Sequence, residues 1–161
     1  MNKYVLVGCD LHDRTMLLKM SLNQGAAEKR SFENTRERRK VMIVELQRRA
    51  LQHQAQVVFA YEASGLGFGL YDELTASGIR CHVLAPSKIK RSPKQRRSKT
   101  DEKDAEHILE LLRGHYLAGN ELPDVWIPDL QTRDDRELVR ARLDAQDKCS
   151  TVKTQVRTDQ G

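Results

Sequence analysis

Short apolar runs alternate with amphipathic stretches along this chain, which is the pattern of a mixed α/β domain. Five runs have the length of strands, at residues 3–10, 15–22, 28–33, 56–61 and 79–84. Helical spacing of apolar residues follows a cap at Asn34 or Thr35 and continues to 53, and recurs at 66–77, 101–112 and from about 130 to 161. The order predicts an antiparallel meander of three strands followed by βα units, with the fourth strand parallel to the first.

The organisation that we expect is a five-stranded mixed sheet with flanking helices at residues 1–115, an irregular linker at 116–129 and a helical arm at 130–161. The helix that ends at His53 has an approximate apolar face of Val41, Val44, Leu46, Ala50 and Leu51. In the arm, apolar residues step by three or four in a heptad-like seam. This seam consists of Leu138, Ala141, Ala145, Cys149, Val152 and Val156. It predicts a coiled coil or dimer arm, and the alternative is a terminal helix packed on its own domain.

Charge and cysteine content narrow the classes of partner and compartment. Lys and Arg number 28 against 23 acids, a net charge of +5, which favours a polyanionic partner. Three scattered cysteines fit neither a disulfide framework nor a zinc site, and indicate a reducing compartment. No apolar run approaches the ~20 residues of a membrane span, and no signal peptide precedes Tyr4. We therefore expect a cytoplasmic protein that has no membrane partner.

Four acids lie at the ends of two strands and at the start of one helix, which the predicted topology brings together. Asp10 and Glu62 each end an apolar strand, while Asp101 and Asp104 open a helix on one of its faces. Adjacent parallel strands hold ligands at their carboxyl ends. Clustered carboxylates repel by roughly 4 kcal/mol per pair at 4 Å and an effective dielectric of ~20, so such a cluster stays partly protonated or binds divalent metal. Alone, Asp101 and Asp104 could simply be acids favoured at a helix start.

A basic run leads directly into the third acid of this set. Residues 90–99 contain no acid and six cations, which are Lys90, Arg91, Lys94, Arg96, Arg97 and Lys99. Such a run beside a carboxylate cluster suits a phosphate backbone, although solvated loops have the same composition. Among other residues, Ser64 is interpreted as a turn serine, His107 as a surface histidine and Trp126 as an anchor of the linker to the core. His12-Asp13 is assigned to the turn of a hairpin.

Three motifs resemble those of the DEDD transposases of bacterial insertion sequences, relatives of the Piv invertase. They are Val7-Gly8-Cys9-Asp10, Tyr61-Glu62-Ala63-Ser64-Gly65 and Lys99-Thr100-Asp101-Glu102-Lys103-Asp104-Ala105. The resemblance implies an RNase H-like (RuvC-like) α/β fold. It also implies that Asp10, Glu62, Asp101 and Asp104 are a catalytic tetrad that binds Mg2+, or Mn2+ in its place.

The resemblance further implies metal-dependent phosphodiester chemistry on DNA, with transposition or site-specific recombination as its outcome. Some family members use an element-encoded guide RNA, and a homo-oligomer is expected for the full-length protein. Such proteins carry a second, serine-bearing domain after a coiled coil. We expect this chain to be the N-terminal catalytic domain, incomplete for strand exchange by itself.

Other classes of function stay open on the sequence. A stand-alone RuvC-like nuclease acting on branched DNA needs no more than the tetrad and the basic run. A non-catalytic nucleic-acid-binding module could use the carboxylates merely to order a metal ion. Half of a sugar-kinase-like ATPase is disfavoured because no Gly-rich phosphate loop follows the first strand.

Overall fold

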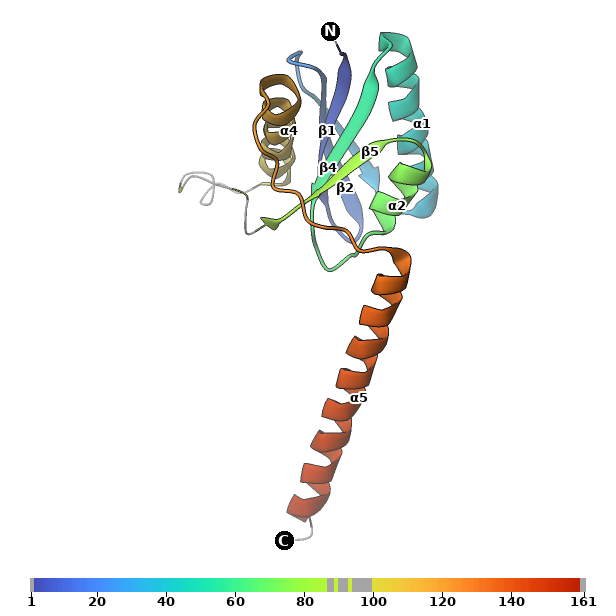
Figure 1. Ribbon diagram of the computed structural model, residues 1–161, viewed down its shortest axis with the longest axis vertical. Coiled ribbons are helices and arrows are strands. Elements are labelled where there is room, and N and C mark those ends of the chain that lie inside the picture. The colour runs from blue at the N-terminus through green and yellow to red at the C-terminus, as the bar shows by residue number, and fades with distance from the viewer. Residues whose placement is uncertain (1, 87–88, 90–92, 94–99, 160–161) are drawn as a thin grey trace. The chain divides into compact units, whose positions relative to one another are not determined.

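The chain forms one mixed five-stranded sheet, as the sequence predicts, followed by a long helix (Figure 1). The computed structural model describes residues 2–86, 89, 93 and 100–159. The strands are β1 (Tyr4–Leu11), β2 (Thr15–Leu22), β3 (Glu28–Glu33), β4 (Gln56–Glu62) and β5 (Arg80–Leu84). The helices are α1 (Arg36–His53), α2 (Gly69–Ala76), α4 (Asp101–Ala118) and α5 (Leu130–Asp159).

The strand order is β3-β2-β1-β4-β5, with β1 in the centre. β1 runs antiparallel to β2 and parallel to β4, and β4 runs parallel to β5. The parallel register pairs Cys9 with Tyr61, so Asp10 and Glu62 occupy the next position on neighbouring strands. Because side chains alternate along a strand, these two acids lie at one end and on one face of the sheet.

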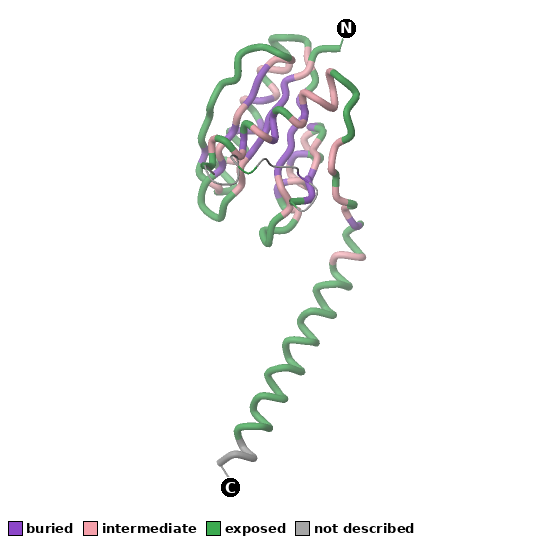
Figure 2. The backbone as a smooth tube through the Cα atoms, turned by 90° about the vertical axis from the view of Figure 1, so that its left-hand side faces the viewer, coloured by how far each residue is buried: buried purple, intermediate pink, exposed green. Residues whose placement is uncertain are grey.

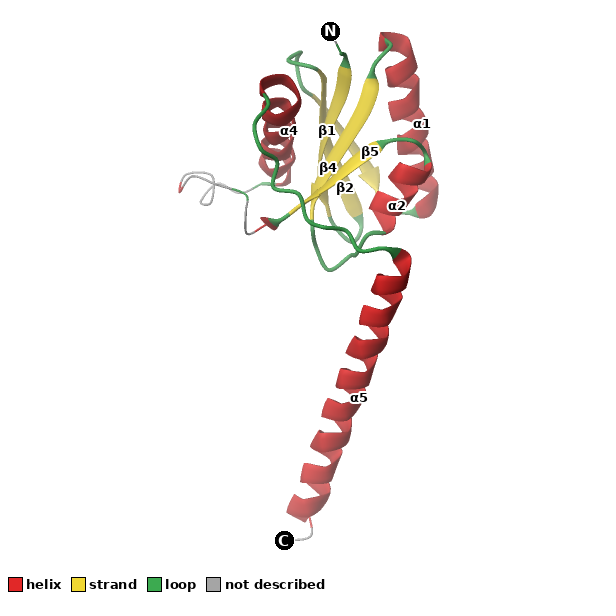
Figure 3. Ribbon diagram, in the orientation of Figure 1, coloured by secondary structure: helices red, strands yellow, loops and turns green. Residues whose placement is uncertain are grey.

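Helices cover the sheet on both faces, with α4 on one face and α1 and α2 on the other (Figure 3). The α4 face has a continuous apolar core of Leu6, Val58, Ala60, Leu84, Ile89, Ile108, Leu109 and Leu112. β1 and β4 lie inside this layered structure and are buried along most of their length (Figure 2). The buried strands explain why both are apolar at consecutive rather than alternate positions.

The apolar face predicted for α1 is wrong in part. The residues that α1 buries are Met42, Ile43 and Leu46, whereas Val41, Val44 and Leu51 are exposed. The run from Val41 to Val44 is apolar at every position, so the sequence pattern does not select one stripe. Packing against the sheet determines which stripe of α1 is buried. Gln47 of α1 also donates a hydrogen bond to the Ser77 carbonyl, directly after α2.

α4 continues six residues beyond the predicted end at residue 112. Gly114 lies inside the helix, and the terminating residue is Gly119, whose φ of 73° is left-handed. Tyr116 and Leu117 pack against the core from this last turn, which offsets the cost of about 1 kcal/mol for an internal glycine. The first residues of the predicted linker at 116–129 are therefore helical.

The segment after α4 covers the outer edge of β5. Ala85 N–H donates to the Pro123 carbonyl, and Val125 N–H donates to the Val83 carbonyl, each at 2.8 Å. The His82 ring joins the same segment, with Nδ1 3.0 Å from Asp124 Oδ1 and Nε2 2.6 Å from the Tyr116 hydroxyl. These contacts make the segment part of the sheet domain.

By its contacts the chain divides into a unit Met1–Val125 and a unit Trp126–Gly161. In the second unit, every side chain from Asp134 to Gln155 is exposed, so the seam residues from Leu138 to Val152 are uncovered in the single chain. Within this unit Trp126 lies beside Arg136, whose guanidinium is 5.5 Å from its ring centre, and its anchoring to the core stays a prediction. No helix in the described part of the chain is long and apolar enough to cross a membrane. The independence of the predicted domains stays a prediction.

Candidate metal centre

The candidate site lies where the carboxyl end of β1 meets the first turn of α4. Thr100 caps this helix by accepting a hydrogen bond from Lys103 N–H at 3.2 Å. The first turn then carries Asp101, Glu102 and Asp104, which suits the positive end of the helix dipole. The cap at Thr100 defines where α4 begins. It thereby places Asp101 and Asp104, the two helix acids of the predicted tetrad, in the first turn.

Glu102 ties this first turn to the far strands of the sheet. Its carboxylate oxygens lie 2.8 Å from Lys19 Nζ on β2 and 3.0 Å from Lys29 Nζ on β3. The two lysines are cross-strand partners in the β2–β3 register. Hydrogen bonds from Lys19 and Lys29 lower the pKa of Glu102, as expected for a carboxylate between two ammonium groups. The ion pairs therefore position the N-terminus of α4 over the sheet.

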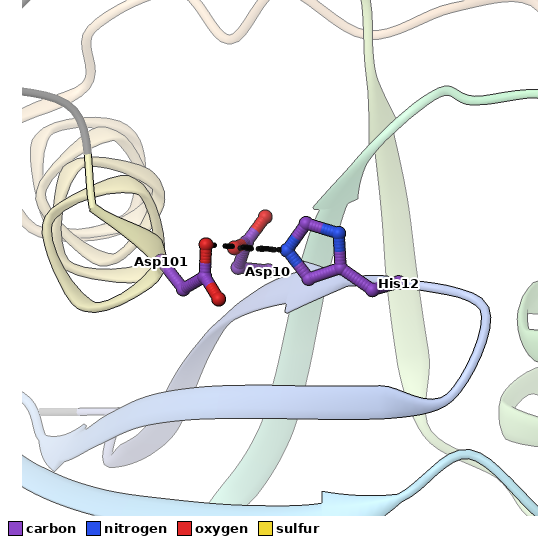
Figure 4. Close-up of side chains that lie close together, drawn as sticks. All are labelled: Asp10, His12 and Asp101. Carbon is purple, nitrogen blue, oxygen red and sulfur yellow. Dashed lines mark hydrogen bonds and ion pairs between the residues drawn. The ribbon is translucent and has the colours of Figure 1, made fainter.

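Asp10, His12 and Asp101 converge at this point (Figure 4). His12 Nε2 lies 2.7 Å from Asp10 Oδ2 and 3.4 Å from Asp101 Oδ1. One potential ligand atom from each residue lies within 4.8 Å of the others. The Asp10 side chain is 16% exposed, whereas those of His12 and Asp101 are 49% and 62% exposed. The group is thus anchored in the sheet at Asp10 and opens to solvent.

The electrostatics of Asp10 favour a bound cation. Burial raises the pKa of the Asp10 carboxyl, the His12 ring opposes this shift, and the negative charges of Asp101 and Asp104 raise it further. The pKa of His12 is raised, chiefly by its hydrogen bond to Asp10. A nearby positive charge stabilises the ionised form of a partly buried carboxylate that lies beside two further acids. Carboxylate oxygens are also suitable ligands for Mg2+ and Mn2+. The residues present therefore fit a divalent metal ion.

The other two predicted tetrad members border this group. Asp104 is half-buried, and its charge acts on Asp10. Glu62 is half-buried at the register position beside Asp10, on the neighbouring strand. The structure thus brings Asp10 and Asp101 together directly and places Asp104 and Glu62 around them. Their role as ligands stays a prediction.

The six cations of the basic run, Lys90, Arg91, Lys94, Arg96, Arg97 and Lys99, lie outside the described residues. Next to the site, a groove of about 730 Å3 is open to solvent. It is lined by Leu11, His12, Asp13, Arg14, Thr15, Ser64, Gly65 and Leu66. Because His12 lines this groove, a large ligand that occupies it would contact His12 beside Asp10.

His12 lies in the hairpin turn, as predicted, and sequence reasoning missed only the approach of its ring to Asp10 and Asp101. The available signal was its position only two residues after Asp10, directly beyond the end of β1 at Leu11. Ser64 accepts a hydrogen bond from Leu66 N–H at 3.3 Å, as a turn serine does. His107 is half-buried rather than on the surface, and its Nε2 has no hydrogen-bond partner among the described residues.

Residues 7–158 match a family model of IS110-type DEDD transposases, which is described as a transposase. The chain belongs to the DEDD transposase family. Over 100 residues, 62% of its length, this DEDD transposase chain is 42% identical to y4qE of Sinorhizobium fredii (strain NBRC 101917 / NGR234), a protein named provisionally as a transposase. The match spans 24% of that relative, so the chain corresponds to about a quarter of its length.

The fold also has a solved counterpart. The Thermus thermophilus RuvC structure superposes with a TM-score of 0.50 over 75% of this chain and 99% of that one, at 12% sequence identity. At this identity the likeness concerns the fold alone. It confirms the expected RuvC-like, RNase H-like sheet for this member of the DEDD transposase family.

Proposed function

We propose that this chain is the nuclease domain of a DNA transposase and cleaves phosphodiester bonds with a divalent metal ion held by Asp10, Glu62, Asp101 and Asp104. The observation that carries the proposal is the convergence of Asp10 and Asp101 between β1 and α4. It occurs in a RuvC-like fold and in a chain of the DEDD transposase family.

The chemistry assigned to the chain follows from this arrangement. When bound, Mg2+ or Mn2+ supplies Lewis-acid stabilisation of charge at the reacting phosphate. Asp10 holds the ion from the rigid centre of the sheet, and Asp101 and Asp104 hold it from the first turn of α4. The groove beside His12 admits the DNA strand, and the cations of residues 90–99 neutralise its phosphates without reading bases.

Cleavage of labelled DNA by the 161-residue chain tests the proposal. We expect nicking of transposon-end DNA that requires Mg2+ or Mn2+ and is abolished by Asp10→Asn and by Asp104→Asn. Glu37→Gln is the matched control, because Glu37 is an exposed acid in the first turn of α1 and lines no part of the groove. Cleavage that persists in Asp10→Asn, or that needs no metal, would refute this assignment.

The same assay separates the two other candidate functions. A stand-alone RuvC-like nuclease would cleave branched DNA to completion without any transposon sequence. A binding module would bind DNA in the presence of metal and leave it intact. For the whole protein we propose recombination of a mobile element, with a homo-oligomer formed through the α5 seam. Guidance by an element-encoded RNA is implied by the family resemblance alone.

A further inference from the structure

His12 lies in the turn between β1 and β2, and its ring has the placement of a metal ligand. Its backbone is held on two sides: His12 N–H donates to the Thr15 carbonyl at 2.9 Å, and its carbonyl accepts from Asn34 Nδ2 at 2.8 Å. These bonds fix the turn after β1, so the ring is directed to Asp10 and Asp101 by a rigid backbone (Figure 4).

The spacing of the donor atoms matches the surroundings of one ion. Neighbouring ligands of a six-coordinate ion bound at about 2.1 Å are about 3 Å apart. His12 Nε2 is 2.7 Å from Asp10 Oδ2 and 3.4 Å from Asp101 Oδ1, on either side of this value. The same nitrogen therefore approaches both acids that converge here, as a third ligand would.

We propose that His12 is a nitrogen ligand of the metal ion at this site and thereby makes the centre selective for Mn2+ over Mg2+. The proposal rests on the proposed function only in requiring that a metal ion binds at Asp10. Mg2+ binds oxygen ligands almost exclusively, whereas imidazole is a good ligand for transition metals. A carboxylate-only centre would discriminate much less between the two ions. The competing interpretation is that His12 merely forms an ion pair with the two acids.

Electron paramagnetic resonance of Mn2+ bound to the full chain distinguishes these interpretations. We expect a nitrogen hyperfine coupling in the wild-type spectrum that is lost in His12→Ala and in His12→Gln. The matched control is His53→Ala, because His53 is an exposed histidine at the end of α1, and its coupling should equal that of the wild type. Since the His12 ring is half-exposed and buries little apolar area, both variants should fold without metal, which metal-free melts check.

Calorimetric titration gives the second readout. His12→Ala should weaken Mn2+ binding by at least about tenfold, since loss of even an outer-sphere partner has this effect. Mg2+ binding should change much less, so the ratio of the two affinities should fall. A Mn2+ signal that depends on Asp10 but has no nitrogen coupling would overturn the inference and leave the proposed nuclease centre intact. If Mn2+ does not bind in an Asp10-dependent way, both the inference and the metal centre are refuted.

Discussion

A Cβ atom on Gly8 would lie 2.4 Å from the carbonyl oxygen of Ala105. β1 and α4 therefore pack backbone against backbone, two residues before Asp10 and one residue after Asp104. The absence of a side chain at position 8 permits this close approach. The approach in turn brings the acids of β1 and α4 together. The glycine is a geometric requirement of the candidate site rather than of the strand.

Gly8→Ala should separate α4 from β1 and weaken both folding and metal binding. The added methyl group meets the backbone of α4, which cannot move aside as a flexible side chain can. Overpacking of this kind costs about 1–3 kcal/mol, which thermal or urea unfolding would measure. Gly69→Ala is the control, because its Cβ would meet nothing within 4 Å. Equal stability of the two variants would show that the close contact is not required.

Asp10→Asn should have opposite effects on stability with and without metal. Without metal, stability should be unchanged or raised, because burial and the neighbouring acids disfavour the Asp10 charge. In millimolar Mg2+ or Mn2+, the wild type should gain about 2.7 kcal/mol at a hundredfold excess over Kd, and the variant should not. Thermal melts of the wild type, Asp10→Asn and the control Glu37→Gln measure this. A metal-induced gain that survives in Asp10→Asn contradicts the assigned site.

Glu102→Gln should lower the melting temperature at pH 7, and the difference should disappear in acid. Lys19 and Lys29 lower the pKa of Glu102 in the folded protein, so its stabilisation is fully present above the unfolded value. This contribution is lost as the pH falls below about 4 through the lowered folded pKa. Melts from pH 7 to pH 3 measure the difference, with Glu106→Gln on the same helix as control. A pH-independent difference would mean that the carboxylate charge is not its cause.

Replacing Arg96 and Arg97 by Ala should weaken DNA binding equally for all sequences. If both contact phosphates, the slope of log K against log salt should fall by about two units, since each contact contributes about 0.9. Fluorescence anisotropy over a series of salt concentrations measures it. Lys40→Ala with Arg48→Ala removes the same charge from α1, on the opposite face of the sheet from α4, and should leave the slope unchanged. An unchanged slope in the Arg96/Arg97 variant would identify the run as a solvated loop.

Removal of residues 146–161 should leave the sheet domain with nearly its full melting temperature at low protein concentration. Described side chains in this part of α5 are exposed, so the single chain loses little buried area. The seam can then be stabilised only against another chain or domain, because ordering it costs about 1–2 kcal/mol per residue. Differential scanning fluorimetry and light scattering test this. A large loss of stability in a monomer would show that the helix packs on its own domain.

The sheet and two of its acids were predictable because their sequence signals are local and strong. Buried strands β1 and β4 contain continuous apolar runs. The first charged residue after each run, Asp10 or Glu62, marks the point where the strand leaves the core. Once the parallel pairing is inferred, Asp10 and Glu62 must be neighbours. The cap at Thr100 and the acids behind it similarly define the start of α4.

The remaining features depend on tertiary contacts that no local pattern contains. Both Gly114 and Gly119 could end α4, and the packing of Tyr116 decides in favour of the second. Two apolar stripes were possible on α1, and the sheet selects one. His12 lies in the predicted turn, and its approach to Asp101 depends on the position of α4, which the local sequence does not contain.

The acids at this centre come from opposite ends of the domain sequence, with Asp10 in the first strand and Asp101 after the last. A nascent chain therefore holds Asp10 long before the ribosome has released α4, and the sheet core on that side remains open until the helix docks. The packing of α4 that buries Leu6 and Leu109 also brings Asp101 to Asp10 and so completes the candidate site. The cleavage that we propose thus requires α4 to be docked on the sheet, and a nascent chain that ends before Asp101 lacks part of the proposed centre.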